Sequence, residues 1–215
     1  MNKLKAFATL LKKPDRLKAL LSYGHKGYLA NIGWFNSFDN QQAMDQHGDP
    51  LPWVTYSFID FVKPRLSKKL SIFEYGSGSS TLFYAKHVKR VVSVEHDEAW
   101  YNKIVKTKAQ NAEMIFSKLE TGGEYSKKAA TLGEQFDMII VDGRDRVNCC
   151  ISSVAALTPT GVIVLDDSER PEYDQACTFL KNAGFKELSF SGISPGLFYL
   201  KATSVFYKAD NCLHI

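Results

Sequence analysis

The chain has 215 residues, 45% of them hydrophobic, and a formal net charge of +4. This length is typical of one domain with a core large enough to fold alone, and no apolar run approaches the roughly 18 residues that a membrane-spanning helix needs. The charge is uneven: residues 1–30 carry +6 (seven lysines or arginines against one aspartate), so residues 31–215 carry −2. A body this close to neutral does not indicate a nucleic-acid partner.

Residues 3–22 predict two short amphipathic helices that are separated at Pro14. Leu4, Phe7 and Leu11 share one apolar face, and Leu17, Leu20 and Leu21 share the next. Such a basic segment commonly packs on the edge of its own domain. The alternative is a weak contact of residues 1–22 with an anionic membrane surface or an acidic partner.

Residues 23–53 predict an ordered lid, because this irregular stretch is rich in aromatic side chains. A helix is expected over residues 54–62, after the Pro-Leu-Pro-Trp segment that ends at Trp53. Trp53, Thr55 and Tyr56 either fold across a bound ligand or pack in the core. The four cysteines have neither zinc-site nor disulfide-scaffold spacing, which indicates reduced thiols, and Cys149 and Cys150 are expected to be buried helix residues. Reduced cysteines predict a cytoplasmic protein. The alternative location is peripheral, at the inner membrane surface.

From residue 70 onward, strand and helix patterns alternate, which predicts an α/β fold with a mostly parallel sheet between two helical layers. Strands are expected over 70–75, 91–95, 113–117, 136–141 and 161–165, and helices over 80–88, 98–109, 125–132, 147–156 and 172–183. The last two strands, 186–191 and 204–208, have no helix between them, so they predict an antiparallel hairpin.

A glycine-serine turn, Gly76 to Thr81, follows the first strand. Thr81 occupies the position of the third glycine of a dinucleotide fingerprint, and Glu74 would repel a pyrophosphate. Glu74 instead favours an ammonium group, either directly or by bracing the turn. Gly76 and Gly78 let the backbone approach a ligand, while the turn hydroxyls bind a carboxylate or cap the helix.

A second acid, Glu95, ends the second strand 21 residues after Glu74. An acid at that position accepts hydrogen bonds from ribose hydroxyls, or is a surface acid at a strand end. His96 either lies along an adenine or caps the next helix. Both acids in βαβ register favour S-adenosylmethionine over a dinucleotide.

These residues resemble the class I S-adenosylmethionine-dependent methyltransferases, a Rossmann-like superfamily that has an acid before G-x-G-x-G where this chain reads FEYGSGSST. The resemblance covers roughly residues 70–208. It implies a seven-stranded sheet in the order 3-2-1-4-5-7-6 with strand seven antiparallel. Residues 1–62 would then form a helical and lid extension, and 63–215 the cofactor-binding domain. The resemblance places the methionine near Glu74, Gly76 and Gly78, the ribose at Glu95 and the adenine at residues 117–119. Together with the turn analysis, it gives the expected cofactor-binding residues Glu74, Tyr75, Gly76, Ser77, Gly78, Ser80, Thr81, Glu95 and His96.

Candidate catalytic residues follow strands four and five, whose carboxyl ends meet at one edge of the sheet. Asp142 and Asp167 are candidate general bases, because burial at a pocket edge raises a carboxyl pKa. The alternative for Asp167 is a turn cap. Arg144, with Arg146, is a candidate for recognising an anionic group on the acceptor, or else starts a solvated helix.

Asp142 and Asp167 also look like the acids of the metal site in catechol-type O-methyltransferases, where an Asn follows the second acid. Ser168 replaces that Asn here, so we expect no metal. The sequence therefore predicts an S-adenosylmethionine-dependent methyltransferase, acting on oxygen of a small-molecule or glycan-like acceptor. The alternative is a non-catalytic nucleoside-binding or membrane-associated scaffold with the same fold, while Thr81 and Glu74 disfavour an NAD-dependent oxidoreductase.

Overall fold

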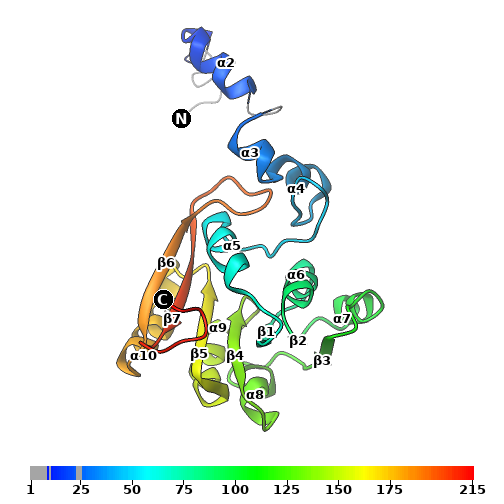
Figure 1. The fold of residues 1–215 in the computed structure, drawn as a ribbon, viewed down its shortest axis with the longest axis vertical. Helices are drawn as coiled ribbons and strands as arrows, with labels where there is room; N and C mark the ends of the chain where they lie inside the picture. Colours follow the sequence, from blue (N-terminus) through cyan, green and yellow to red (C-terminus); the bar gives the residue numbers. More distant parts are fainter. Residues whose placement is uncertain (1–8, 10, 23–25) are drawn as a thin grey trace.

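A seven-stranded sheet forms the centre of the protein in the computed structural model, which describes residues 9, 11–22 and 26–215 (Figure 1). The strand order is β3-β2-β1-β4-β5-β7-β6. The bounds are β1 Ser71–Tyr75, β2 Arg90–Glu95, β3 Ala112–Phe116, β4 Phe136–Val141, β5 Leu157–Asp166, β6 Lys186–Gly192 and β7 Lys201–Tyr207. Neighbouring strands are parallel, except that β7 is antiparallel to both β5 and β6. The predicted class, strand order and terminal hairpin are confirmed.

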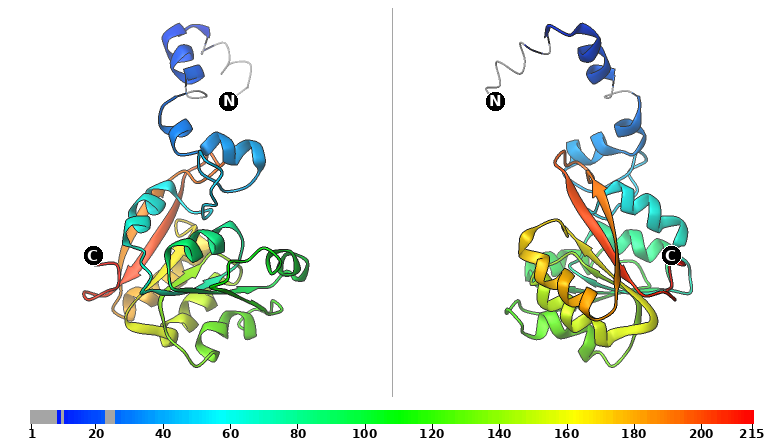
Figure 2. Two further views of the ribbon diagram at one scale, coloured as in Figure 1. Left: turned by 45° about the vertical axis from the view of Figure 1, so that its right-hand side comes forward. Right: turned by 90° about the vertical axis from the view of Figure 1, so that its left-hand side faces the viewer.

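Helices cover both faces of the sheet (Figures 1 and 2). The bounds are α5 Tyr56–Val62, α6 Ser79–His87, α7 Glu98–Ile104, α8 Glu124–Thr131, α9 Arg146–Ser153 and α10 Asp174–Asn182, with single 3-10 turns over Lys63–Arg65, Val154–Ala156 and Pro171–Tyr173. Cys149 and Cys150 are buried in α9 as predicted, and all four cysteines are free. Among the described residues, no helix has the length and apolar character to cross a bilayer.

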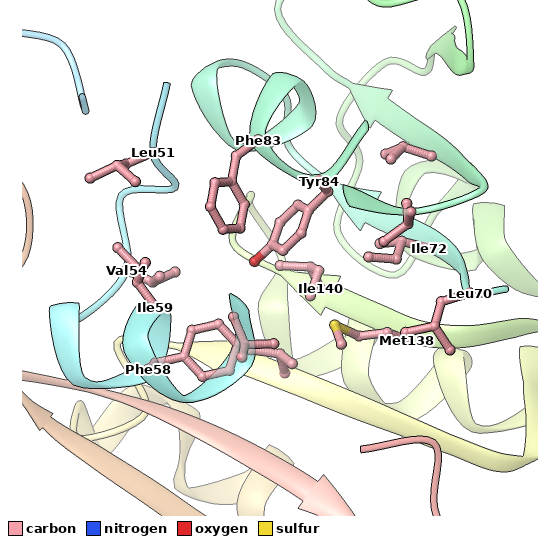
Figure 3. Close-up of a cluster of buried hydrophobic side chains, with 14 of the residues drawn as sticks. Leu51, Val54, Phe58, Ile59, Leu70, Ile72, Phe83, Tyr84, Met138 and Ile140 are labelled. Carbon is pink, nitrogen blue, oxygen red and sulfur yellow. The ribbon is translucent and has the colours of Figure 1, made fainter. Parts of the chain in front are cut away.

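Strand alternation decides which side chains face which helices. In β1, Ile72 packs with α5 and α6, whereas Phe73 and Tyr75 pack in the second core under α8 and α9. Figure 3 shows the first core, where Phe58 of α5 and Tyr84 of α6 lie over the sheet. Glu74 therefore points to the same face as Ile72, toward the N-terminus of α6.

Several predicted boundaries are wrong by a few residues. The helix predicted from residue 54 begins at Tyr56, because the N-cap Thr55 is extended (ψ 142°). The helix predicted to reach 109 ends at Ile104. Strand β5 begins at Leu157 rather than Gly161, since its pairing with β4 shifts register between Phe136 and Met138 and accommodates a bulge.

In the described part of the N-terminal region, short helices precede the core: α2 Pro14–Ser22, α3 Tyr28–Asn31 and α4 Trp34–Asn40. The first predicted amphipathic helix, with Leu4 and Phe7, lies largely outside the described residues. In Figures 1 and 2, α2 projects away from the sheet, beyond α3 and α4.

Candidate functional site

A cavity of about 410 Å³ opens at the carboxyl ends of β1 and β4. Its wall combines the glycine turn, α7, the β4 tip and the N-terminal segment. The lining residues are Gln41, Gln42, Ala43, Trp53, Glu74, Tyr75, Gly76, Ser77, Gly78, Ser79, Ser80, Leu82, Trp100, Lys103, Ile104 and Asp142. This volume lies within the range of small-molecule sites, and the carboxyl edge of a parallel sheet is where ligands bind in open α/β folds.

The glycine turn has a conformation that requires glycine at its first position. Gly76 has φ +97°, and a Cβ there would lie 3.3 Å from the main-chain oxygen of Asp142. The amide of Gly78 donates to Thr81 Oγ1 at 3.1 Å. Thr81 thereby fixes the turn, so the residue that replaces a fingerprint glycine has a structural role of its own.

Glu74 stabilises this turn through hydrogen bonds that its carboxylate accepts. Its side chain is buried, and its Oε2 accepts hydrogen bonds from Thr81 Oγ1 at 2.6 Å and Ser93 Oγ at 2.8 Å. Burial raises the pKa of the Glu74 carboxyl, and the hydroxyl donors only partly oppose that effect. The site therefore holds a desolvated carboxyl at the cavity wall, where a cationic ligand group would favour its ionised form.

Glu95 braces the same turn from the other side. Its Oε2 accepts from Ser77 Oγ at 2.8 Å, and its Oε1 accepts from the amides of His96 and Asp97 at 2.8 and 3.0 Å. Glu95 and His96 do not line the cavity, and the His96 ring packs edge-on against Tyr125. The structure thus connects Glu95 to the cavity through Ser77.

Trp100 and Lys103 are among the lining residues that no sequence motif indicates. The Trp100 indole Nε1 donates to the Ser77 oxygen at 2.9 Å, and Lys103 Nζ lies 4.7 Å from the indole centroid. The available signal was Asp97, an N-cap whose Oδ1 accepts from the Trp100 amide and so places that indole one turn into α7. Tyr75 is part of the cavity lining, while its side chain packs in the second core.

The tips of β4 and β5 carry a buried network of charges. Asp142 borders the cavity and pairs with Arg146 at 3.1 Å, while Arg146 also reaches Asp167 at 3.1 Å. Lys201, only 4% exposed, bridges Asp166 at 2.6 Å and Asp167 at 2.8 Å. Arg144, the predicted recognition residue, is exposed and outside the cavity; its neighbour Arg146 joins the acids instead.

The two candidate bases differ in their electrostatic surroundings. Burial and the nearby Asp166 carboxylate raise the pKa of Asp142 well above its usual range, against the opposing effect of Arg146. At Asp167, burial acts in the same upward direction, but the contacts with Lys201, Arg146 and Arg170 outweigh it and lower the pKa. Asp142 is consequently the carboxyl suited to accept a proton, and Asp167 is held ionised away from the cavity.

Asp142 and Asp167, the acids that resemble a metal site, do not form an open donor set. Arg146 already contacts both Asp142 and Asp167, and Lys201 occupies the remaining side of Asp167. Ser168 Oγ lies 2.7 Å from Ser204 Oγ. Within the described part of the chain, no group of three His, Cys, Asp or Glu side chains has the arrangement to hold a metal ion. These residues do not fit a divalent cation.

Solved structures share this fold. A methyltransferase-like protein of Silicibacter pomeroyi has a TM-score of 0.53 and 23% identity, covering 73% of this chain and 89% of its own. The precorrin-6y C5,15-methyltransferase of Geobacter metallireducens has a TM-score of 0.52 and 15% identity, covering 80% of this chain and 97% of its own. A candidate methyltransferase of Streptococcus mutans, in complex with SAH, has a TM-score of 0.51 and 13% identity, covering 69% of this chain and 94% of its own.

No protein-family model matches the sequence, and no curated protein matches it. The identities to the solved structures lie below the level at which activity can be transferred, so the comparison concerns architecture. The strand order, the antiparallel β7 and these structural matches together show that the chain has the fold of the class I S-adenosylmethionine-dependent methyltransferases.

Proposed function

We propose that this protein is an S-adenosylmethionine-dependent methyltransferase that acts on a hydroxyl oxygen of a small-molecule or glycan-like acceptor. The observation that carries the proposal is that one cavity contains both the braced glycine turn and Asp142. The two halves of a methyl-transfer site, a cofactor pocket and a proton acceptor, therefore share one wall.

The residues of the cavity fit the cofactor's chemistry. The buried carboxyl of Glu74 suits the methionine ammonium group, and the turn offers main-chain donors close to the ligand. Leu82, Trp100 and Ile104 supply apolar contact area beside it. Glu95 already accepts three hydrogen bonds, so we expect it to hold a ribose hydroxyl jointly with Ser77 rather than alone.

The cofactor supplies an electrophilic methyl group when bound. Asp142 would accept the proton that the acceptor hydroxyl loses on methylation, and its raised pKa suits this role. Arg146 orients the Asp142 carboxyl through the 3.1 Å contact. Trp53 and Gln42 also line the cavity, and an indole and an amide suit a hydroxylated acceptor.

Calorimetry with S-adenosylhomocysteine tests the cofactor assignment. We expect saturable binding to the wild type and at least about tenfold weaker binding to Glu74→Gln, since one lost charge-assisted contact costs about 1.5–3 kcal/mol. Glu134→Gln is the matched control, because Glu134 pairs with Arg90 away from the cavity. No binding of S-adenosylhomocysteine at millimolar concentration, or tighter binding of NAD, contradicts the proposal.

Methyl incorporation into a panel of sugars, phenols and amines tests the reaction. We expect transfer to a hydroxylated acceptor, with kcat in Asp142→Asn lowered by about 10²-fold or more and cofactor affinity unchanged. Transfer only to amines would contradict the assignment to oxygen. Cofactor binding without transfer to any acceptor would instead support the non-catalytic scaffold.

A further inference from the structure

An exposed apolar patch lies at the turn between β6 and β7. Phe198, Tyr199 and Leu200 are 75%, 50% and 74% exposed, and Phe38 of α4, 41% exposed, lies beside Phe198 with ring centroids 6.4 Å apart. These four residues are termed the apolar tip. Three consecutive exposed apolar side chains are unfavourable in water and commonly mark an interaction surface.

The loop that precedes the apolar tip is fixed by hydrogen bonds and close packing. The preceding loop accepts hydrogen bonds from Trp34 Nε1 at the Leu197 oxygen (2.7 Å) and from Trp53 Nε1 at the Pro195 oxygen (2.6 Å). Gly196 packs so closely that a Cβ would lie 3.0 Å from the Phe38 amide nitrogen. A loop anchored at these points has a defined conformation, so the exposure of the residues that follow is built into the fold.

Helix α2 presents a second apolar surface with basic flanks. Leu17, Leu20 and Leu21 share an arc of about 100° on the helix, with Arg16 on one side and Lys18 on the other. Leu20 and Leu21 are 46% and 66% exposed, so this face is not packed on the domain edge. Residues 11–22 carry four cationic side chains against one acidic.

We propose that the apolar tip and α2 dock together on an anionic lipid surface. Figures 1 and 2 show the β6–β7 turn beside α4, and α2 farther out beyond α3, both at the end of the molecule that carries the N-terminal helices. Apolar side chains flanked by lysine and arginine suit the boundary between anionic headgroups and acyl chains, where the cationic heads remain hydrated. The inference concerns lipid binding alone and does not depend on the proposed methyl transfer.

Co-sedimentation of the full chain with vesicles tests this proposal. We expect the wild type to sediment with vesicles of phosphatidylcholine and phosphatidylglycerol, less so at high salt, and not with phosphatidylcholine alone. The tip variant Phe198→Ser/Tyr199→Ser/Leu200→Ser should partition at least about tenfold more weakly. Leu20→Ser/Leu21→Ser should also weaken binding, and it keeps the test valid if the tip variant misfolds.

Phe116→Ser is the matched control, because Phe116 is 40% exposed but lies on β3 at the opposite edge of the sheet. It should bind the vesicles as the wild type does. The proposal would be overturned if the tip variant and the helix variant both bound the vesicles as strongly as the wild type, or if the wild type did not bind. Sedimentation velocity without lipid gives a further refutation: a wild-type dimer that the tip variant converts to monomer would mean that a second copy covers the patch.

Discussion

Replacing Lys201 by methionine should destabilise the fold strongly, and more so at high pH. The ammonium group is 2.6 Å from Asp166 and 2.8 Å from Asp167, and the exposed fractions of the three side chains are 4%, 1% and 7%. Methionine keeps the apolar stem, so the change removes charge with little loss of packing. Two buried carboxylates then lose their nearest cation.

The expected loss follows from what remains around the acids. Removing one partner of a buried ion pair costs about 3–5 kcal/mol. Arg170 and Arg146 stay 2.9 and 3.1 Å from Asp167, but Arg146 is 3.8 Å from Asp166, so the remaining cations compensate for Asp166 only in part. We expect a decrease in the free energy of unfolding of about 3 kcal/mol at pH 8, a large share of the roughly 5–15 kcal/mol typical of a domain.

The sign of the pH dependence is fixed by proton linkage. Without Lys201 the carboxyl pKa values rise in the folded state, so the folded protein binds more protons than the unfolded chain. The variant therefore loses stability as pH rises. The loss caused by Lys201→Met should be larger at pH 8 than at pH 5, by about 1 kcal/mol or more.

Urea unfolding at both pH values measures this effect. Lys181→Met is the control, because Lys181 also pairs with a glutamate at 2.7 Å but is 54% exposed, and it should lose less than about 1 kcal/mol. Adding Asp166→Asn to Lys201→Met should restore part of the stability. A loss below about 1 kcal/mol at pH 8, or an equal loss at both pH values, would refute the reasoning.

Three further changes test the turn and the network. Gly76→Ala should lower the free energy of unfolding in urea by about 1–2 kcal/mol more than Gly184→Ala does. Both glycines have a positive φ, but of the two only Gly76 has atoms within 4 Å of the position that a Cβ would take. Equal losses for the two variants would contradict this close contact. Burial raises the pKa of Glu74 in the folded state, so the stability that Glu74 contributes is lost as pH rises. In thermal unfolding, Glu74→Gln should therefore gain stability relative to the wild type from pH 5 to pH 8. A difference between the two proteins that stays constant with pH would be inconsistent with the raised pKa. Arg146→Lys should lower the urea-unfolding free energy by about 2 kcal/mol, since one ammonium cannot reproduce the guanidinium fork; a neutral result would mean that the fork geometry is unimportant.

The fold and half of the site could be predicted because their signals are local. Alternating strand and helix patterns give the sheet, and the acids at strand ends are adjacent to apolar runs in the sequence. Glu74 and Asp142 were identified in this way, and both line the cavity. Their contacts were not, since Thr81 and Ser93 approach Glu74 only after β1 and β2 pair.

The missed residues depend on tertiary structure. Lys201 follows Asp166 by 35 residues and reaches it because β7 pairs antiparallel with β5. In the sequence it follows three apolar residues and resembles an ordinary surface lysine. Arg146 rather than Arg144 joins Asp142 for the same reason: Asp142 lies in the loop before α9 and Arg146 is the first residue of that helix, so helical i, i+4 spacing does not predict their contact.

Lys201 and Arg146 also explain how three aspartates coexist at the edge of the sheet. Asp166 and Asp167 contact Lys201, so their charges are neutralised away from the cavity. Among the described residues, Asp142 has only Arg146 as an ion-pair partner, and Arg146 is shared with Asp167. Protonation of Asp142 would leave every remaining carboxylate with its cation and would relieve the repulsion from Asp166. The network therefore directs proton uptake to Asp142, the aspartate of these three that lines the cavity, which is the property that a general base in this position requires.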